Sequence, residues 1–209
     1  MINVSYDLKR IKQDYYCIIN SSTILIDETS DDGRAELTME FQKTSGRQFI
    51  KLLRETDHSW LGYLENNSCA DGIIIELIGT SCNLYIVELK RTVNDQKWTG
   101  KIRKQFRGAT LRALAFLSSL GIKDIMNIEY FTAYVTSYMD QHIQAAKAKQ
   151  KISNSSIIGK KAKLGIKDEE VLEWELDEIT VFNSKFTHHK VELQRNANNI
   201  GIGNFIVNN

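Results

Sequence analysis

The chain of 209 residues has no proline, only three cysteines and no long hydrophobic run. The cysteines are odd in number and none has C-x-x-C spacing, which argues against a disulfide framework and against a zinc site. We therefore expect reduced thiols and a cytoplasmic protein. No apolar stretch approaches the roughly 20 residues that a membrane-spanning helix needs. The charged N-terminal stretch does not resemble a signal peptide, so we expect neither a signal peptide nor a membrane partner.

A large excess of charge of one sign is also missing. The net charge of +1 excludes a globally basic nucleic-acid-binding protein, but it leaves room for the local basic patch that such binding requires. With 42% hydrophobic and 25% charged residues, the composition is that of an ordinary globular protein. The length suits one domain, or one domain with an extension.

The spacing of apolar residues predicts an α/β fold. The predicted elements, in chain order, are a hairpin at 22–41, a helix at 46–55, two strands within 69–93, a long helix, a strand at 128–138 and a helix at 141–150. The long helix has Asn94 or Asp95 as a candidate N-cap and Gly121 as a C-terminal stop. The order of helix, strand, strand, helix and strand predicts a central mixed β-sheet flanked by helices.

Three regions are expected along the chain. Residues 1–150 form the main domain, 151–167 a basic linker or loop, and 168–209 a C-terminal β-region. Seven lysines and no acid lie between residues 147 and 167. This lysine-rich segment would act as an arm that tracks DNA, form a solvated linker, or be held by the acidic run that follows it.

Three charged residues stand inside the apolar strands of 69–93, namely Asp71, Glu88 and Lys90. A buried charge is costly unless it is paired or bound to a metal. Side chains alternate between the two faces of a strand, so a turn with an even number of residues places all three on one face. A turn at residues 80–81 would place Asp71 opposite Lys90, away from the turn, and make a compact cluster of two acids and one base.

Two carboxylates at this separation suit Mg²⁺, with Mn²⁺ as a substitute, because hard cations prefer oxygen ligands. Such a metal polarises a phosphodiester, and the ammonium group of Lys90 would orient water or neutralise charge in the transition state. The cluster therefore suits phosphodiester hydrolysis. The alternative is a buried Asp71–Lys90 ion pair with Glu88 at a sheet edge, and the pattern alone favours that alternative.

The long helix that follows favours the nuclease interpretation. Gln105 lies at the edge of its apolar stripe, and no acid interrupts its cations between residues 97 and 112. These cations are Lys97, Lys101, Arg103, Lys104, Arg107 and Arg112. We expect Lys101, Lys104 and Arg107 to contact nucleic-acid phosphates, whereas the simpler interpretation is a solvated helix face.

The D…E-x-K arrangement of Asp71, Glu88 and Lys90, followed by a helix that bears Gln105, resembles the PD-(D/E)XK nuclease superfamily. The resemblance covers about residues 46–138 and implies a restriction-endonuclease-like fold. It also implies a Mg²⁺-dependent deoxyribonuclease with Asp71 and Glu88 as metal ligands. Lys90 would be the catalytic lysine and Gln105 an auxiliary active-site residue.

The sequence departs from this family at two places. Ala70 stands where the motif has proline, which many members also lack. Ile50 stands where some members have a glutamate in their first helix; Glu55 and Glu65 are the nearby candidates to replace it. A second metal site depends on such a replacement.

The expected function is therefore a metal-dependent DNA endonuclease, and by analogy the effector of a bacterial defence or restriction system. The alternative is a non-cleaving module of the same fold that binds nucleic acid or a partner protein. Cutting both DNA strands in one encounter needs two sites related by a two-fold axis, so we expect a homodimer or a regulatory protein partner. The C-terminal β-region would cover the sheet edge or form the dimer contact. The reason is that it carries apolar residues that we expect to be exposed, namely Trp174, Val181, Phe182 and Phe186. The histidine pair at 188–189 is expected at the surface.

Overall fold

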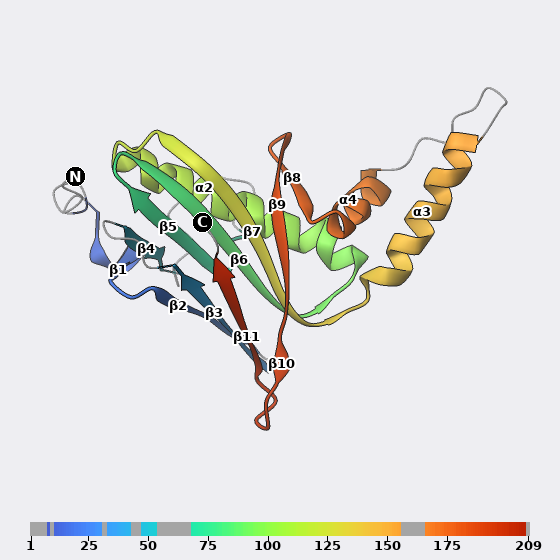
Figure 1. The fold of residues 1–209 in the computed structure, drawn as a ribbon, viewed down its shortest axis with the longest axis horizontal. Coiled ribbons are helices and arrows are strands. Elements are labelled where there is room, and N and C mark those ends of the chain that lie inside the picture. Colours follow the sequence, from blue (N-terminus) through green and yellow to red (C-terminus); the bar gives the residue numbers. More distant parts are fainter. Residues whose placement is uncertain are drawn as a thin grey trace.

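The computed structural model describes Leu8 and residues 11–30, 33–42, 47–53, 68–155 and 166–207. These residues form two β-sheets and the helices that pack on them (Figure 1). The helices are η1 (Gln13–Tyr15), the π-helix η2 (Lys97–Ile102), α2 (Arg103–Ser119), α3 (Met139–Ser155) and α4 (Ile166–Glu175). The strands are β1 (Tyr16–Ile19), β2 (Thr23–Ser30), β3 (Gly33–Phe41), β4 (Gln48–Leu52), β5 (Gly72–Ile78), β6 (Ser81–Val93), β7 (Asp124–Ser137), β8 (Glu178–Val181), β9 (Ser184–Glu192), β10 (Gln194–Arg195) and β11 (Gly201–Val207).

The larger sheet has seven strands in the order β1-β4-β5-β6-β7-β9-β8. Neighbouring strands from β1 to β6 are antiparallel, and β6, β7 and β9 are parallel. The predicted mixed α/β sheet is thus confirmed. Helix α2 lies along one face of this sheet, as Figure 1 shows, and its apolar side chains join those of β5 and β6 in one hydrophobic cluster.

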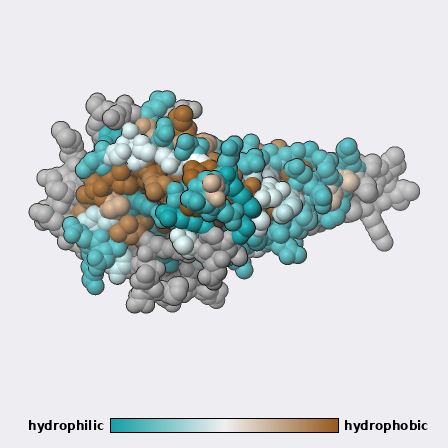
Figure 2. All heavy atoms as spheres, turned by 90° about the horizontal axis from the view of Figure 1, so that it is seen from below, coloured by the Kyte–Doolittle hydropathy of each residue, from teal (hydrophilic) through white to brown (hydrophobic). Residues whose placement is uncertain are grey.

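The smaller sheet, in the order β10-β11-β3-β2, covers the other face of the larger one. It joins the two ends of the chain, because the expected N-terminal hairpin forms β2 and β3 and the last strand, β11, pairs in parallel with β3. Figure 2, seen from below, shows hydrophobic side chains gathered among hydrophilic ones on this side of the molecule. Leu25, Ile202 and Ile206 of this sheet are exposed.

The helix expected at 46–55 is wrong, because the described part of this segment is strand β4. The adjacent residues Phe49 and Ile50 belong to the two different hydrophobic clusters on opposite faces of the larger sheet. A strand that is buried on both faces loses its polar alternation, so its apolar residues can imitate helical spacing. Glu55 and Glu65 lie outside the described residues.

The lysine-rich segment also differs from expectation. Helix α3 continues to Ser155, and α4 begins at Ile166, so the expected β-region from residue 168 starts with a helix. Lys147 pairs with Glu175 at 2.5 Å, and Lys149 pairs with Asp168 at 2.7 Å. The neighbouring acidic helix therefore holds these two lysines, which was one of the three alternatives.

The C-terminal strands cover a sheet edge. β9 pairs with β7 and β8 extends the larger sheet further, while β11 belongs to the smaller sheet. Trp174 and Val181 are buried, against expectation, because their side chains join the hydrophobic cluster on the α2 side of the sheet. Phe186 is half-buried, and Phe182 is exposed as expected. Within the described residues, no helix has the length and apolar character needed to cross a membrane.

Candidate active site

The turn between β5 and β6 determines where the three charges lie. It contains two residues, Gly79 and Thr80, because Ile78 pairs with Ser81. Gly79 has a φ of 61°, a conformation that glycine adopts without the cost of a Cβ and that tight hairpin turns require. The expected even turn is confirmed, but its position differs by one residue from the expected one.

The observed register moves Asp71 along its partner strand. Gly72 pairs with Val87, so Asp71, just before the paired region, lies beside Glu88. The expected neighbour was Lys90. A shift of two residues leaves every side chain on the same face, so the predicted common face for the charges is kept. We call Asp71, Glu88 and Lys90 the charged cluster.

The charged cluster lies where β6 continues beyond the start of β5. The side chain of Asp71 occupies this edge, and its Oδ2 accepts a hydrogen bond of 2.8 Å from the amide of Leu89. On the opposite side of β6, Glu88 is the register partner of Thr132 in β7. The cluster therefore lies within the sheet at an edge of β6 that strand β5 does not cover.

All three charged side chains are buried: the exposed fraction is 8% for Asp71, 0% for Glu88 and 9% for Lys90. The ammonium group of Lys90 forms an ion pair with Glu88 Oε1 and donates a hydrogen bond of 2.9 Å to the carbonyl of Leu89. Glu88 Oε2 has no hydrogen-bond partner among the described residues. Buried carboxylate oxygens normally have partners, so this atom has an open position for a ligand.

The electrostatics of the cluster agree with this geometry. Burial and then the charge of Asp71 raise the pKa of Glu88 to about 8, although Lys90 opposes the shift. Burial lowers the pKa of Lys90, but the two carboxylates outweigh it and raise that pKa above its ordinary value. Lys90 is therefore positively charged near neutral pH, and Glu88 would gain from a cation.

Helix α2 and the preceding π-helix η2 place Gln105 beside this end of the sheet. The start and stop signals expected from the sequence are confirmed, since Asn94 Oδ1 accepts a hydrogen bond from the Lys97 amide and Gly121 has a φ of 75°. Gln105 Nε2 donates to the carbonyl of Cys69 at 3.4 Å, two residues before Asp71. Gln105 Oε1 is buried and has no hydrogen-bond partner among the described residues.

The expected phosphate-binding residues share one exposed face. Lys101, Lys104 and Arg107 are all exposed and occur every third residue, with buried residues between them. Arg103 does not belong to this face, because it is buried and pairs with Glu170 and Glu173.

His188 was wrongly predicted to lie at the surface. It is fully buried against Trp98 and Trp174, and its Nε2 lies 2.9 Å from Thr132 Oγ1. Burial, with smaller effects of nearby cations, lowers its pKa well below the ordinary value, so the ring is neutral. The sequence offers no signal for this position, since the layers on both faces of β9 come from distant segments.

The donor chemistry of the charged cluster fits Mg²⁺. Within the described ranges, no group of three or more His, Cys, Asp and Glu side chains is arranged to hold a metal. Mg²⁺ commonly uses one or two carboxylates and keeps several waters, which Asp71 and Glu88 can satisfy. The unpartnered oxygen of Glu88 and its raised pKa are the features that a bound cation would relieve.

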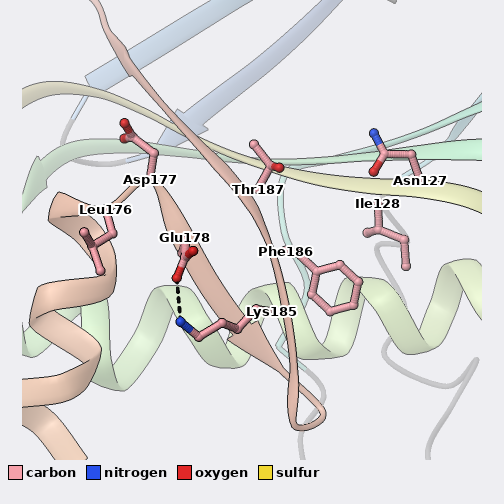
Figure 3. Close-up of a pocket in the computed structure, with 8 residues that line it drawn as sticks. All are labelled: Asn127, Ile128, Leu176, Asp177, Glu178, Lys185, Phe186 and Thr187. Carbon is pink, nitrogen blue, oxygen red and sulfur yellow. Dashed lines mark hydrogen bonds and ion pairs between the residues drawn. The ribbon is translucent and has the colours of Figure 1, made fainter.

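A separate pocket of about 440 Å³ lies between β7, the β8–β9 hairpin and the end of α4 (Figure 3). An ion pair of 2.7 Å between Glu178 and Lys185 crosses it. None of its lining residues belongs to the charged cluster, so this pocket is not part of the candidate site.

Comparisons with protein-family models, with curated proteins and with solved structures found no match to this chain. Any functional assignment therefore depends on the residues and their geometry.

Proposed function

We propose that this protein is a metal-dependent endonuclease that hydrolyses phosphodiester bonds in DNA. The observation that carries the proposal is the charged cluster itself. Asp71, Glu88 and Lys90 are buried together at an edge of β6 that β5 does not cover, and Glu88 has a carboxylate oxygen with no partner among the described residues. A purely structural ion pair would have no need of a second carboxylate that raises the pKa of the first.

Each member of the site has a distinct role in this proposal. Asp71 and Glu88 hold Mg²⁺ or Mn²⁺, which supplies Lewis-acid activation of the scissile phosphate. Lys90 is charged at neutral pH, and in this proposal it orients the attacking water and neutralises developing negative charge. Gln105 offers a buried amide oxygen that can accept a hydrogen bond from a water in the site.

The exposed face of α2 would bind the substrate. Lys101, Lys104 and Arg107 are exposed, and in this proposal they contact the phosphate backbone without reading its sequence. The order of β5, β6, α2 and β7 suits the restriction-endonuclease-like fold that the resemblance implies, and we propose that fold and DNA as the substrate on that ground. By analogy, we also propose that the protein acts in a defence system, either as a homodimer or together with a regulatory protein partner.

The test is cleavage of supercoiled plasmid DNA by the full chain, in one reaction with roughly 5–10 mM Mg²⁺ and in a parallel reaction with EDTA. We expect cleavage that needs the metal and that falls at least about 100-fold in Glu88→Gln, because this variant removes the charge without changing the shape. Equal cleavage by the variant would refute the assignment of the site.

The second candidate function is a module that binds nucleic acid or a partner protein without cutting. Two observations favour it: Lys90 already neutralises Glu88, and no three-ligand metal group is found among the described residues. Retardation of DNA in a gel, with no cleavage in Mg²⁺ or Mn²⁺, would select this candidate.

A further inference from the structure

A cavity of about 200 Å³ lies where the chain passes twice between the two sheets. Residues 20–22 lead from β1 in the larger sheet to β2 in the smaller one, while Gln42 follows β3 and Arg47 precedes β4. The amide of Phe41 donates a hydrogen bond of 2.7 Å to Ser22 O, which links the two crossings. All these residues except Phe41 line the cavity, so its walls come from both connections.

The cavity is separate from the charged cluster. Its apolar wall consists of Ile19 and Phe49, register partners in β1 and β4, which pack in the hydrophobic cluster between the two sheets. Glu88 instead shares a strand face with Ile86, whose side chain belongs to the hydrophobic cluster under α2. The cavity and the candidate active site therefore lie on opposite faces of the larger sheet.

A buried acid holds Arg47 at this cavity. Arg47 Nη1 donates a hydrogen bond of 2.7 Å to Oε1 of Glu76, which is fully buried. The other oxygen of Glu76 accepts hydrogen bonds of 2.9 Å from Asn83 and 2.8 Å from Tyr85. Because both oxygens of Glu76 are occupied, this carboxylate fixes the guanidinium of Arg47 by one of its three nitrogens.

The rest of the guanidinium is open. Nε and Nη2 of Arg47 make no hydrogen bond or ion pair with a described residue, and neither atom is sealed in the interior. Their N–H groups lie on the same side of the planar guanidinium, with a spacing that matches two oxygens of a carboxylate or a phosphate. The hydroxyl of Ser22 and the side-chain amide of Asn20, which also line the cavity, have no hydrogen-bond partner among the described residues either.

We propose that this cavity binds a small oxyanion, a phosphate or a carboxylate, through Nε and Nη2 of Arg47. Glu76 positions the guanidinium, Ser22 and Asn20 supply further donors, and Phe49 contacts the apolar part of the ligand. The cavity is smaller than the roughly 300–1,000 Å³ typical of sites for drug-sized ligands, so the ligand is a small metabolite anion. This second ligand site does not depend on the proposed function.

The experiment follows the arginine Nε–H signals of the full chain by ¹H–¹⁵N NMR, with sodium phosphate, acetate or chloride added at constant ionic strength. The Arg47 signal should shift to saturation with phosphate or acetate, with half-saturation on the order of 1 mM, and should not do so with chloride. The oxyanion that saturates at the lower concentration identifies the ligand class. Arg34 is the internal reference, because its Nε already pairs with Glu36 at 2.8 Å.

A pair of matched variants tests the role of the guanidinium. Arg47→Lys keeps a positive charge beside Glu76 but lacks the two parallel N–H groups, so half-saturation followed at the Ser22 amide should rise at least about 10-fold. Arg34→Lys should leave it unchanged. The amide spectrum of each variant also reports whether the fold is retained.

The outcomes separate this inference from the proposed function. Equal oxyanion binding by Arg47→Lys and Arg34→Lys, or an Arg47 signal that responds alike to all three salts, would show that the cavity is no oxyanion site. Glu88→Gln should bind the oxyanion as the wild type does, even where it has lost DNA cleavage. If Glu88→Gln loses oxyanion binding, the anion lies at the charged cluster and the proposal for the cavity is wrong.

Discussion

Two fully buried glutamates lie on the same β-hairpin and have opposite surroundings. Glu76, near the turn, receives hydrogen bonds from Asn83 and Tyr85 and pairs with Arg47 at 2.7 Å. Glu88, at the other end, pairs with no described residue except Lys90 and lies near a second carboxylate. A buried charge that serves the fold is surrounded by donors, whereas one that serves a ligand keeps an oxygen open.

Activity should show the largest difference between the two ends. Glu88→Gln and Asp71→Asn should each lower DNA cleavage by at least about 100-fold, because each removes a proposed metal ligand. Glu76→Gln should cut at nearly the wild-type rate at a temperature where it is folded. The measurement is initial cleavage rate in Mg²⁺, and a Glu76→Gln variant as inactive as Glu88→Gln would remove the distinction.

Lys90 sharpens the comparison within the charged cluster. Lys90→Met should lower the cleavage rate by a similar factor of about 100-fold. It should nevertheless leave Mn²⁺ binding at least as tight as in the wild type. The reason is that a competing positive charge has been removed from beside Glu88. Calorimetric titration with Mn²⁺ checks this, and a loss of binding would mean that Lys90 positions the ligands.

Stability should show the reverse order of the two glutamates. Glu76→Gln leaves Arg47 without its carboxylate and should lower the free energy of unfolding by on the order of 3 kcal/mol. Glu88→Gln should cost much less, since its charged form is poorly compensated in the fold. Urea unfolding at pH 7 compares them, and a greater loss in Glu88→Gln would contradict the comparison.

The pH dependence follows from the pKa of Glu88. That pKa is raised from 4.5 to about 8 in the folded chain, so the folded state holds a proton that the unfolded state releases. In EDTA, wild-type stability from this group is complete below pH 4.5 and is lost as the pH rises through 8. The stability of Glu88→Gln relative to the wild type should therefore rise by on the order of 2 kcal/mol between pH 5 and pH 8.5.

Urea unfolding at both pH values measures this rise in relative stability. Mg²⁺ should cancel the rise by stabilising the wild type, and it should leave the variant unchanged. A constant difference between the two proteins across this range would show that Glu88 stays ionised in the fold.

The smallest effects belong to the surface of α2. Neutralising Lys101, Lys104 or Arg107 should each lower the slope of log affinity for DNA against log salt by about one unit. Lys123→Ala is a matched control, because Lys123 is exposed just beyond the other end of the same helix. Fluorescence anisotropy with a labelled duplex gives the slopes, and equal slopes for all four variants would place DNA elsewhere.

The sequence alone determined those features that depend on neighbouring residues. Alternation along β5 and β6 placed Asp71, Glu88 and Lys90 on one face, and this survived a shift of two residues in register. The cap at Asn94 and the stop at Gly121 likewise depend on local hydrogen bonds and backbone conformation. Such signals act within a few residues, so they can be recognised before the fold is known.

Only the tertiary structure decided which side chains are covered. The segment 46–55, expected as a helix, forms strand β4 in its described part, and His188 is buried, because distant segments pack on both faces of the larger sheet. Arg103 is buried because helix α4, far along the chain, supplies Glu170 and Glu173 as its partners. Burial and proximity are set by contacts between segments far apart in the chain, and no local pattern encodes them.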